Sequence, residues 1–221
     1  MRKLVVVLCI TAGLFAPRTG SAATLLVSPY APAEAIVSFD VTGAQVRYRA
    51  ADDRFYIARS IESATWGYGA FFATLGYVSK TSFEDLELAE FDDDEAGYVL
   101  ALGARGPVWS TGDFSAALHA QFHTLNEKVL LDETSYDLQS IELLAGADAV
   151  WSPGPWSVYA GLQVVPYSDI ELDYFTDNQV ERTDFILLRV GGRVPFGPMS
   201  LDVEIPFIGA EGVRIGLSYA F

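Results

Sequence analysis

The chain has 221 residues, of which 51% are hydrophobic, 13% aromatic and 19% charged, and its formal net charge is −15. The aromatic content argues against a disordered chain. The negative charge argues against nucleic-acid binding, because phosphate contacts need a basic surface. A single cysteine excludes a disulfide framework and a cysteine-based metal site, and the length predicts one domain.

Residues 1–23 are predicted to be a secretory signal peptide. Arg2 and Lys3 precede the apolar run 4–16, which is too short to cross a bilayer comfortably as a helix, and residues 21–23 are small, as cleavage sites require. We expect cleavage after Ala23 and export from the cytoplasm. Cleavage would remove three basic residues and leave a net charge of −18. Residues 24–39 contain two prolines and are predicted to form a periplasmic lead-in.

From residue 40 onward, apolar and polar residues alternate with a period of two, which is typical of β-strands. The predicted strands are 41–50, 54–62, 66–79, 96–105, 114–124, 138–151, 156–165, 184–194, 199–207 and 211–221. Short connections at 106–112, 152–155 and 195–198 alternate with longer polar loops at 80–95, 126–136 and 168–183. The connection at 208–211 departs from this alternation, because it is short but falls on the long-loop side.

These features predict an all-β fold, a closed antiparallel transmembrane β-barrel over residues 40–221. Both chain ends should lie in the periplasm, so the strand number is even. Ten strands are favoured, and eight is the alternative if the hairpin 41–62 lies outside the barrel. At either size side chains can largely fill the interior, which argues against a wide general porin.

The orientation of the strands decides between a membrane barrel and a soluble one. The apolar faces carry no charge over a stretch comparable to the ~9–11 residues of one membrane crossing. A basic residue on the lipid face would cost ~2–4 kcal/mol at mid-bilayer. The opposite faces carry isolated charges of both signs, which can pair inside a closed cylinder. This predicted interior network comprises His119, His123, Glu142, Asp148, Arg189, Arg193, Asp202, Glu204 and Arg214.

Aromatic and acidic residues separate toward opposite ends of the predicted barrel. The aromatic residues expected at the membrane interface of the short-turn end are Trp66, Trp109, Trp151, Trp156, Phe196 and Phe221. Seventeen of the 29 acidic residues fall in or beside the three long loops. The alternative, a soluble periplasmic barrel with an apolar interior that holds a ligand, does not explain why every tryptophan gathers at one end.

The signal peptide, the alternating strands and the terminal sequence from Gly216 to Phe221 resemble those of the small outer-membrane β-barrels of Gram-negative bacteria, in the broad OmpA-, OmpX- and OmpW-like sense. The resemblance covers about residue 40 to the end. It implies a location in the outer membrane, contact with membrane lipid and lipopolysaccharide, and recognition of Phe221 by the barrel-assembly machinery. It points to no single family within this class.

Two groups of residues raise the question of catalysis or metal binding. His119 and His123 lie four apart on one predicted face, and a metal site would need further converging ligands. Lipid A deacylases carry catalytic residues that face lipid, whereas both histidines here face inward. Omptin-like proteases use acidic residues and a histidine at the outer rim, and His123 lies toward that rim, but no segment matches the rest of that pattern. Asp92, Asp93, Asp94 and Glu95 are a weak candidate for a divalent cation site without EF-hand spacing.

We therefore expect a barrel without catalysis or cofactor that contributes to envelope structure or passes small solutes slowly. Three alternatives remain open. They are a narrow cation-preferring channel, a membrane-embedded enzyme acting on lipid A or peptides, and a soluble periplasmic ligand-binding barrel.

Overall fold

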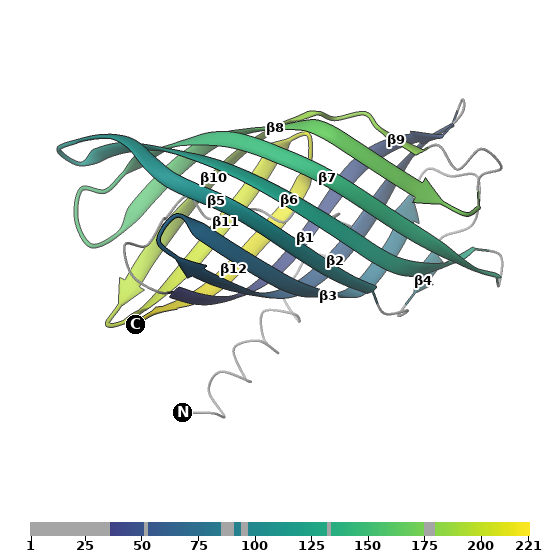
Figure 1. Cartoon of the computed structure of the whole chain (residues 1–221), viewed down its shortest axis with the longest axis horizontal. Helices are drawn as coiled ribbons and strands as arrows, with labels where there is room; N and C mark the ends of the chain where they lie inside the picture. Colours follow the sequence, from purple (N-terminus) through teal and green to yellow (C-terminus); the bar gives the residue numbers. More distant parts are fainter. Residues whose placement is uncertain (1–35, 51–52, 85–90, 94–96, 132–133, 175–179) are drawn as a thin grey trace.

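The computed structural model describes residues 36–50, 53–84, 91–93, 97–131, 134–174 and 180–221. They form one antiparallel sheet of twelve strands that closes on itself (Figure 1). The strands are β1 (Ile36–Ala50), β2 (Asp53–Tyr68), β3 (Phe71–Glu84), β4 (Phe91–Asp93), β5 (Gly97–Thr111), β6 (Phe114–Leu131), β7 (Thr134–Trp151), β8 (Ser157–Leu172), β9 (Val180–Arg182), β10 (Ile186–Phe196), β11 (Met199–Ile208) and β12 (Glu211–Ala220). The predicted all-β, closed antiparallel class is confirmed.

Ten long strands make the wall of the barrel. They pair in chain order from β1 to β12, leaving out β4 and β9, and β12 pairs with β1 to close the ring. The hairpin 41–62, whose inclusion separated ten strands from eight, is part of this wall as β1 and β2. The sheet has twelve strands rather than ten, because two three-residue strands add to it at the loop end.

Several strand boundaries differ from the sequence-based prediction. β1 begins at Ile36, inside the predicted lead-in, because residues 36–39 continue the ladder with the end of β12. At the other end β6 runs to Leu131 and β7 begins at Thr134, inside a predicted loop. At the loop-side ends of these strands the contrast between the faces is reversed, because Asn126 and Lys128 face outward whereas Leu125 and Val129 are buried. The signal peptide and most of the lead-in lie outside the described residues.

The short connection at 208–211 has a structural explanation. β11 and β12 have only 10 residues each, whereas β1 has 15, so their turn lies below the loop end of the barrel. Gly209 makes this turn with a φ of 74°, and a Cβ there would lie 1.9 Å from the carbonyl oxygen of Ile186. Beyond the turn, β9 pairs with β1 and, at one position, with β8. β9 thus continues the wall where the short hairpin stops.

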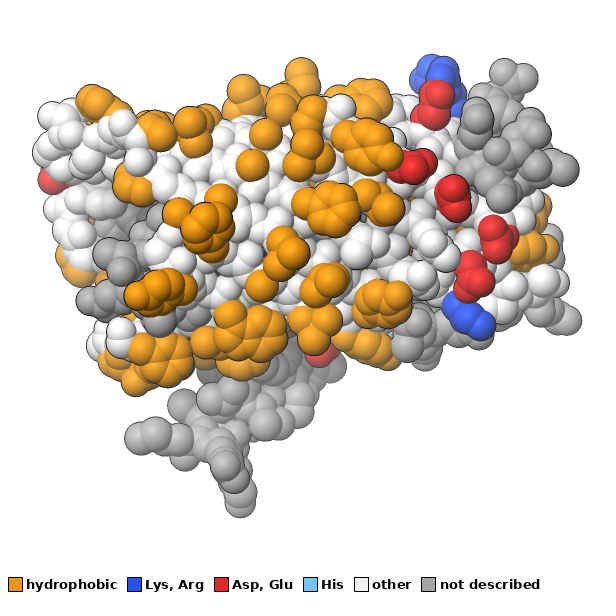
Figure 2. All heavy atoms as spheres, viewed as in Figure 1, with side chains coloured by type: hydrophobic (Ala, Val, Ile, Leu, Met, Phe, Trp, Pro, Cys, Tyr) orange, Lys and Arg blue, Asp and Glu red, His pale blue; other side chains and the backbone are white. Residues whose placement is uncertain are grey.

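In the turn half and the middle of the wall, the apolar faces of the strands point outward and the charged faces point inward, whereas at the loop end buried apolar side chains also point inward. Leu102, Val194 and Ile205 are about half exposed, whereas Arg189 and Asp202 are buried. Figure 2 shows hydrophobic side chains spread over the wall, with acidic side chains gathered toward the loop end. Within the described residues, no helix is long and apolar enough to cross a membrane. An apolar exterior around a charged interior is the arrangement of a transmembrane β-barrel.

Candidate functional site: the filled interior of the barrel

The loop half of the interior is filled by apolar side chains, which the sequence analysis did not predict. They come from the loop-side ends of the strands, and the most buried include Phe55, Ile57, Leu138, Leu172 and Leu187. We call this group, with the other buried apolar residues packed against it, the apolar plug. Close-packed interiors of this kind leave few voids larger than a water molecule. The plug therefore occupies much of the loop half of the interior.

The turn half of the interior holds a network of ion pairs centred on Arg189 of β10. Its Nη2 lies 2.8 Å from Asp148 Oδ1 on β7, and its Nη1 lies 3.0 Å from Glu204 Oε2 on β11. The hydroxyl of Tyr159 donates a hydrogen bond to the same Glu204 oxygen. His119 Nδ1 lies 3.0 Å from Asp148 Oδ2. A single guanidinium thus joins a carboxylate on the adjacent strand β11 to one on β7, which is separated from β10 by β8.

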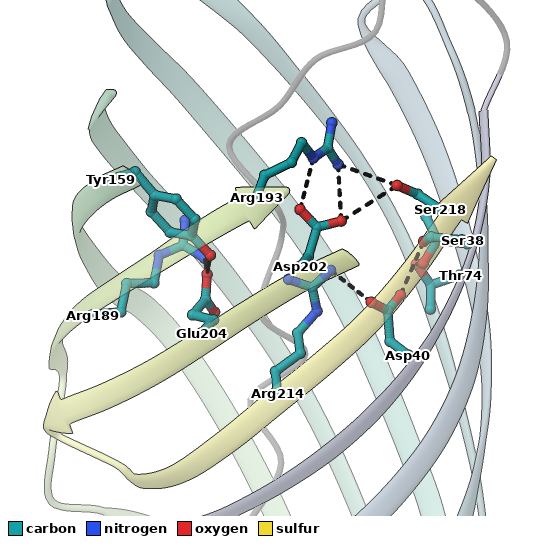
Figure 3. A network of polar contacts seen from close by, with 11 residues as sticks. Ser38, Asp40, Thr74, Tyr159, Arg189, Arg193, Asp202, Glu204, Arg214 and Ser218 are labelled. Carbon is teal, nitrogen blue, oxygen red and sulfur yellow. Dashed lines mark hydrogen bonds and ion pairs between the residues drawn. The ribbon is translucent and has the colours of Figure 1, made fainter. Parts of the chain in front are cut away.

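Two further ion pairs lie beside this centre (Figure 3). Arg193 donates to both oxygens of Asp202, at 2.7 and 3.0 Å, and Ser218 donates to Asp202 as well. Arg214 Nη2 lies 2.7 Å from Asp40 Oδ1, which joins β12 to β1 across the closure of the ring. Pairs of this kind fix the register of neighbouring strands from inside the barrel.

Two more ion pairs lie among the side chains of the apolar plug. Arg59 Nε donates to Glu127 at 2.7 Å, and the Thr81 hydroxyl donates to the other carboxylate oxygen. Arg182 of β9 donates to both oxygens of Glu142 at 2.9 Å. β9 is beyond the apolar belt, because the residue before Arg182 is an exposed glutamate that pairs with Arg49. Burial alone would lower the pKa of Arg182, but the Glu142 carboxylate raises it above its usual value.

The charges inside the barrel balance among the described residues. Six arginines and six carboxylates are buried or nearly so: Arg59, Arg105, Arg182, Arg189, Arg193 and Arg214 with Asp40, Glu127, Glu142, Asp148, Asp202 and Glu204. A buried charge is tolerated only when it is paired and hydrogen-bonded. Loss of any single partner therefore leaves an unpaired charge in the interior and destabilises the barrel. These ion pairs act as rigid cross-links between the strands.

The structure places all nine residues of the predicted network inside the barrel and brings most of them into contact. It also adds Asp40, Arg59, Arg105, Glu127 and Arg182, which the sequence analysis did not assign to the network. Glu127 was expected in a solvated loop, but it is buried, because β6 extends beyond its predicted end. Continuing the period-two alternation through the polar ends of the strands is the signal that could have found these residues.

The predicted interface aromatics lie on the outer surface. Trp66, Trp109, Trp151, Trp156, Phe196 and Phe221 are all exposed, and they lie at or next to the short turns or the chain end. Trp151 packs edge-on against Trp156, and Phe114 stacks on Trp151. Phe221 packs edge-on against Tyr219. These rings form an aromatic cluster at the short-turn end of the barrel.

The two histidines do not belong to a metal site in the described part of the chain. There, no group of three or more His, Cys, Asp and Glu side chains is arranged to hold a metal ion. His123 Nε2 lies 3.2 Å from Glu142, which also accepts a hydrogen bond from Ser168 at 3.0 Å. The Ser168 hydroxyl thus donates to the carboxylate rather than to the histidine. The side chains of residues 92–95 lie outside the described residues.

Comparisons with known proteins return matches only among solved structures. No family model matches the chain, and no curated protein matches it. The translocator domain of the autotransporter NalP from Neisseria meningitidis is 14% identical, with 96% of this chain and 92% of that chain covered and a TM-score of 0.46.

Two further solved structures match over most of their length. The transport unit of the autotransporter AIDA-I from Escherichia coli is 11% identical, with 91% of this chain and 95% of that chain covered and a TM-score of 0.40. The β-domain of the Bordetella autotransporter BrkA is 13% identical, with 85% and 99% covered and a TM-score of 0.35. No function is carried over from similarities at these levels. The closed antiparallel wall with its apolar exterior is the architecture of a transmembrane β-barrel.

Proposed function

We propose that this protein is a sealed β-barrel of the bacterial outer membrane, exported by its signal peptide, that contributes to envelope structure without catalysis. The observation that carries the proposal is the apolar plug, in which Phe55, Leu138 and Leu187 are completely buried in the loop half of the interior. A conducting pore needs a continuous polar path, whereas packed apolar side chains occupy the loop half of this interior and the ion pairs among them are buried and closed on one another.

The outer surface supports a lipid environment for the barrel. A belt of exposed apolar side chains surrounds the wall, and aromatic residues border it at the short-turn end. Membrane lipid would cover this belt, and lipopolysaccharide would surround its loop end. The exposed ring of Phe221 at the chain terminus is the candidate contact for the barrel-assembly machinery.

Planar-bilayer recording of the purified, refolded protein tests whether the barrel is sealed. We expect no steady unitary conductance under conditions in which a general porin conducts. Steady unitary events would contradict the proposal in favour of a narrow channel. Heat-modifiable migration on gels would show that the recorded protein is folded.

Cell fractionation tests the membrane location separately. We expect the protein in the detergent-soluble outer-membrane fraction. A protein recovered as a folded monomer in plain buffer would contradict the location and favour a soluble ligand-binding barrel.

A further inference from the structure

A groove of about 650 Å³ opens on the outer face of the barrel over β7, β8, β10 and β11, near the short-turn end. Nine of its lining residues have outward-pointing side chains or, for glycine, an outward position. Its floor is made by Ala149, Ala160 and Gly192, where the wall carries almost no side-chain volume.

The groove exists because small residues lie together on the outer face of the wall. Tyr159 on β8 points inward, and its ring fills the space beneath Gly191 on β10, so neither residue adds side-chain volume to the outer face. The next residue, Gly192, faces outward and has no side chain to cover the wall from outside. Larger outward side chains on both sides then stand above this floor.

The walls of the groove are apolar and partly rigid. Phe114, Trp151 and Val158 line one side, and Val190, Val203 and Ile205 line the other. Phe114 and Trp151 stack with ring centroids 6.2 Å apart, and Trp151 packs against Trp156 at 5.6 Å. Aromatic pairs of this kind stabilise each other beyond their burial, so this wall is held in place without a ligand.

We propose that this groove binds one acyl chain of a membrane phospholipid. The inference rests on the proposed membrane location. No lining side chain is charged, so the groove suits hydrocarbon rather than a headgroup or a phosphate. The groove is continuous with the apolar belt, which lipid acyl chains surround at the proposed location. An acyl chain in the groove contacts the protein on three sides, whereas an acyl chain on the flat wall contacts it on one side. The acyl chain in the groove therefore makes more dispersion contacts.

The test uses photo-crosslinking in vesicles. The full chain is refolded into phosphatidylethanolamine vesicles that contain a small fraction of the same lipid with a diazirine in the acyl chain, and labelled peptides are mapped by mass spectrometry. We expect labelling to concentrate on Val190, Val203 and Ile205, compared with Leu100 and Leu102 on the opposite wall, which are similarly exposed. Equal labelling of the two walls would overturn the proposal.

Variants that fill the groove sharpen this result. Ala160→Leu places a larger side chain on the floor, and Ala149→Leu does so from the neighbouring strand. Ala120→Leu is the matched control, since Ala120 also faces outward but does not line the groove. We expect the excess labelling to be lost in both groove variants and kept in the control. Excess labelling that survives in both folded groove variants would overturn the proposal.

Two other outcomes separate this inference from the proposed function. If the protein does not insert into the vesicles, both walls stay unlabelled, and this result contradicts the membrane location itself. A second copy of the chain seated in the groove would protect it from lipid and give a dimer in vesicles that Ala160→Leu dissociates. That result would overturn acyl-chain binding while leaving the membrane location intact.

Discussion

Tyr159 lies across Gly191 on the neighbouring strand, and a Cβ at that glycine would come within 2.4 Å of the tyrosine Cζ. The same relationship joins His119 to Gly146 and Asp148 to Gly161. Large inward side chains thus occupy the space left by an inward glycine on the next strand. This pairing of large with small residues is what lets so many ring-bearing and charged side chains fit inside one narrow barrel.

Gly191→Ala should therefore destabilise the barrel, because the added methyl group displaces the Tyr159 ring from its hydrogen bond to Glu204. Overpacking of a filled interior costs about 1–3 kcal/mol. Urea unfolding in detergent micelles, followed by tryptophan fluorescence, measures the change. Gly106→Ala is the control, because a Cβ there meets nothing within 4 Å. Equal stability of the two variants would show that the ring moves at no cost.

Arg189→Met should be among the most damaging single substitutions. It leaves Asp148 and Glu204 without their guanidinium partner inside the barrel, and removing one member of a buried pair costs about 3–5 kcal/mol. The matched control is Arg49→Met, whose partner Glu181 is well exposed and whose pair contributes about 0–1 kcal/mol. Unfolding in micelles compares the two variants. Similar losses in both would mean that the interior is hydrated enough to screen its charges.

Leu102→Arg tests which face meets lipid. Leu102 is exposed in the middle of the apolar belt, where an arginine on the lipid face costs about 2–4 kcal/mol. Gln139→Arg, on the outward face of β7 near the loop end, should cost far less. Folding yield and unfolding free energy in lipid vesicles provide the readout. A neutral effect of Leu102→Arg would favour a barrel whose outer surface meets water.

Replacing Leu138, Leu144 and Leu187 together by serine should open the apolar plug. All three side chains are completely buried, and their loss creates polar space in the loop half of the interior. We expect unitary conductance from this variant and none from the parent protein. The control replaces Leu75, Leu100 and Leu118, which are exposed on the outer wall, by serine. Silence from a correctly folded triple interior variant would mean that the charged layer alone seals the barrel.

The sequence by itself determined the barrel class, the outward direction of the apolar faces and the placement of the tryptophans. Alternation with a period of two assigns each side chain to a face before any strand partner is known, so Leu188 and Arg189 could be placed on opposite faces without tertiary information. The same alternation placed both histidines inside.

Only the tertiary structure decided which charges meet and how the ends of the barrel are completed. Arg214 pairs with Asp40, 174 positions away in the chain, because β12 closes on β1 in one particular register. Glu127 became an interior residue and β9 became part of the wall because strand pairing continued past the apolar belt. The groove also depends on which small residues become neighbours. Register between distant strands is a property of the closed ring, and no local segment of the chain carries it.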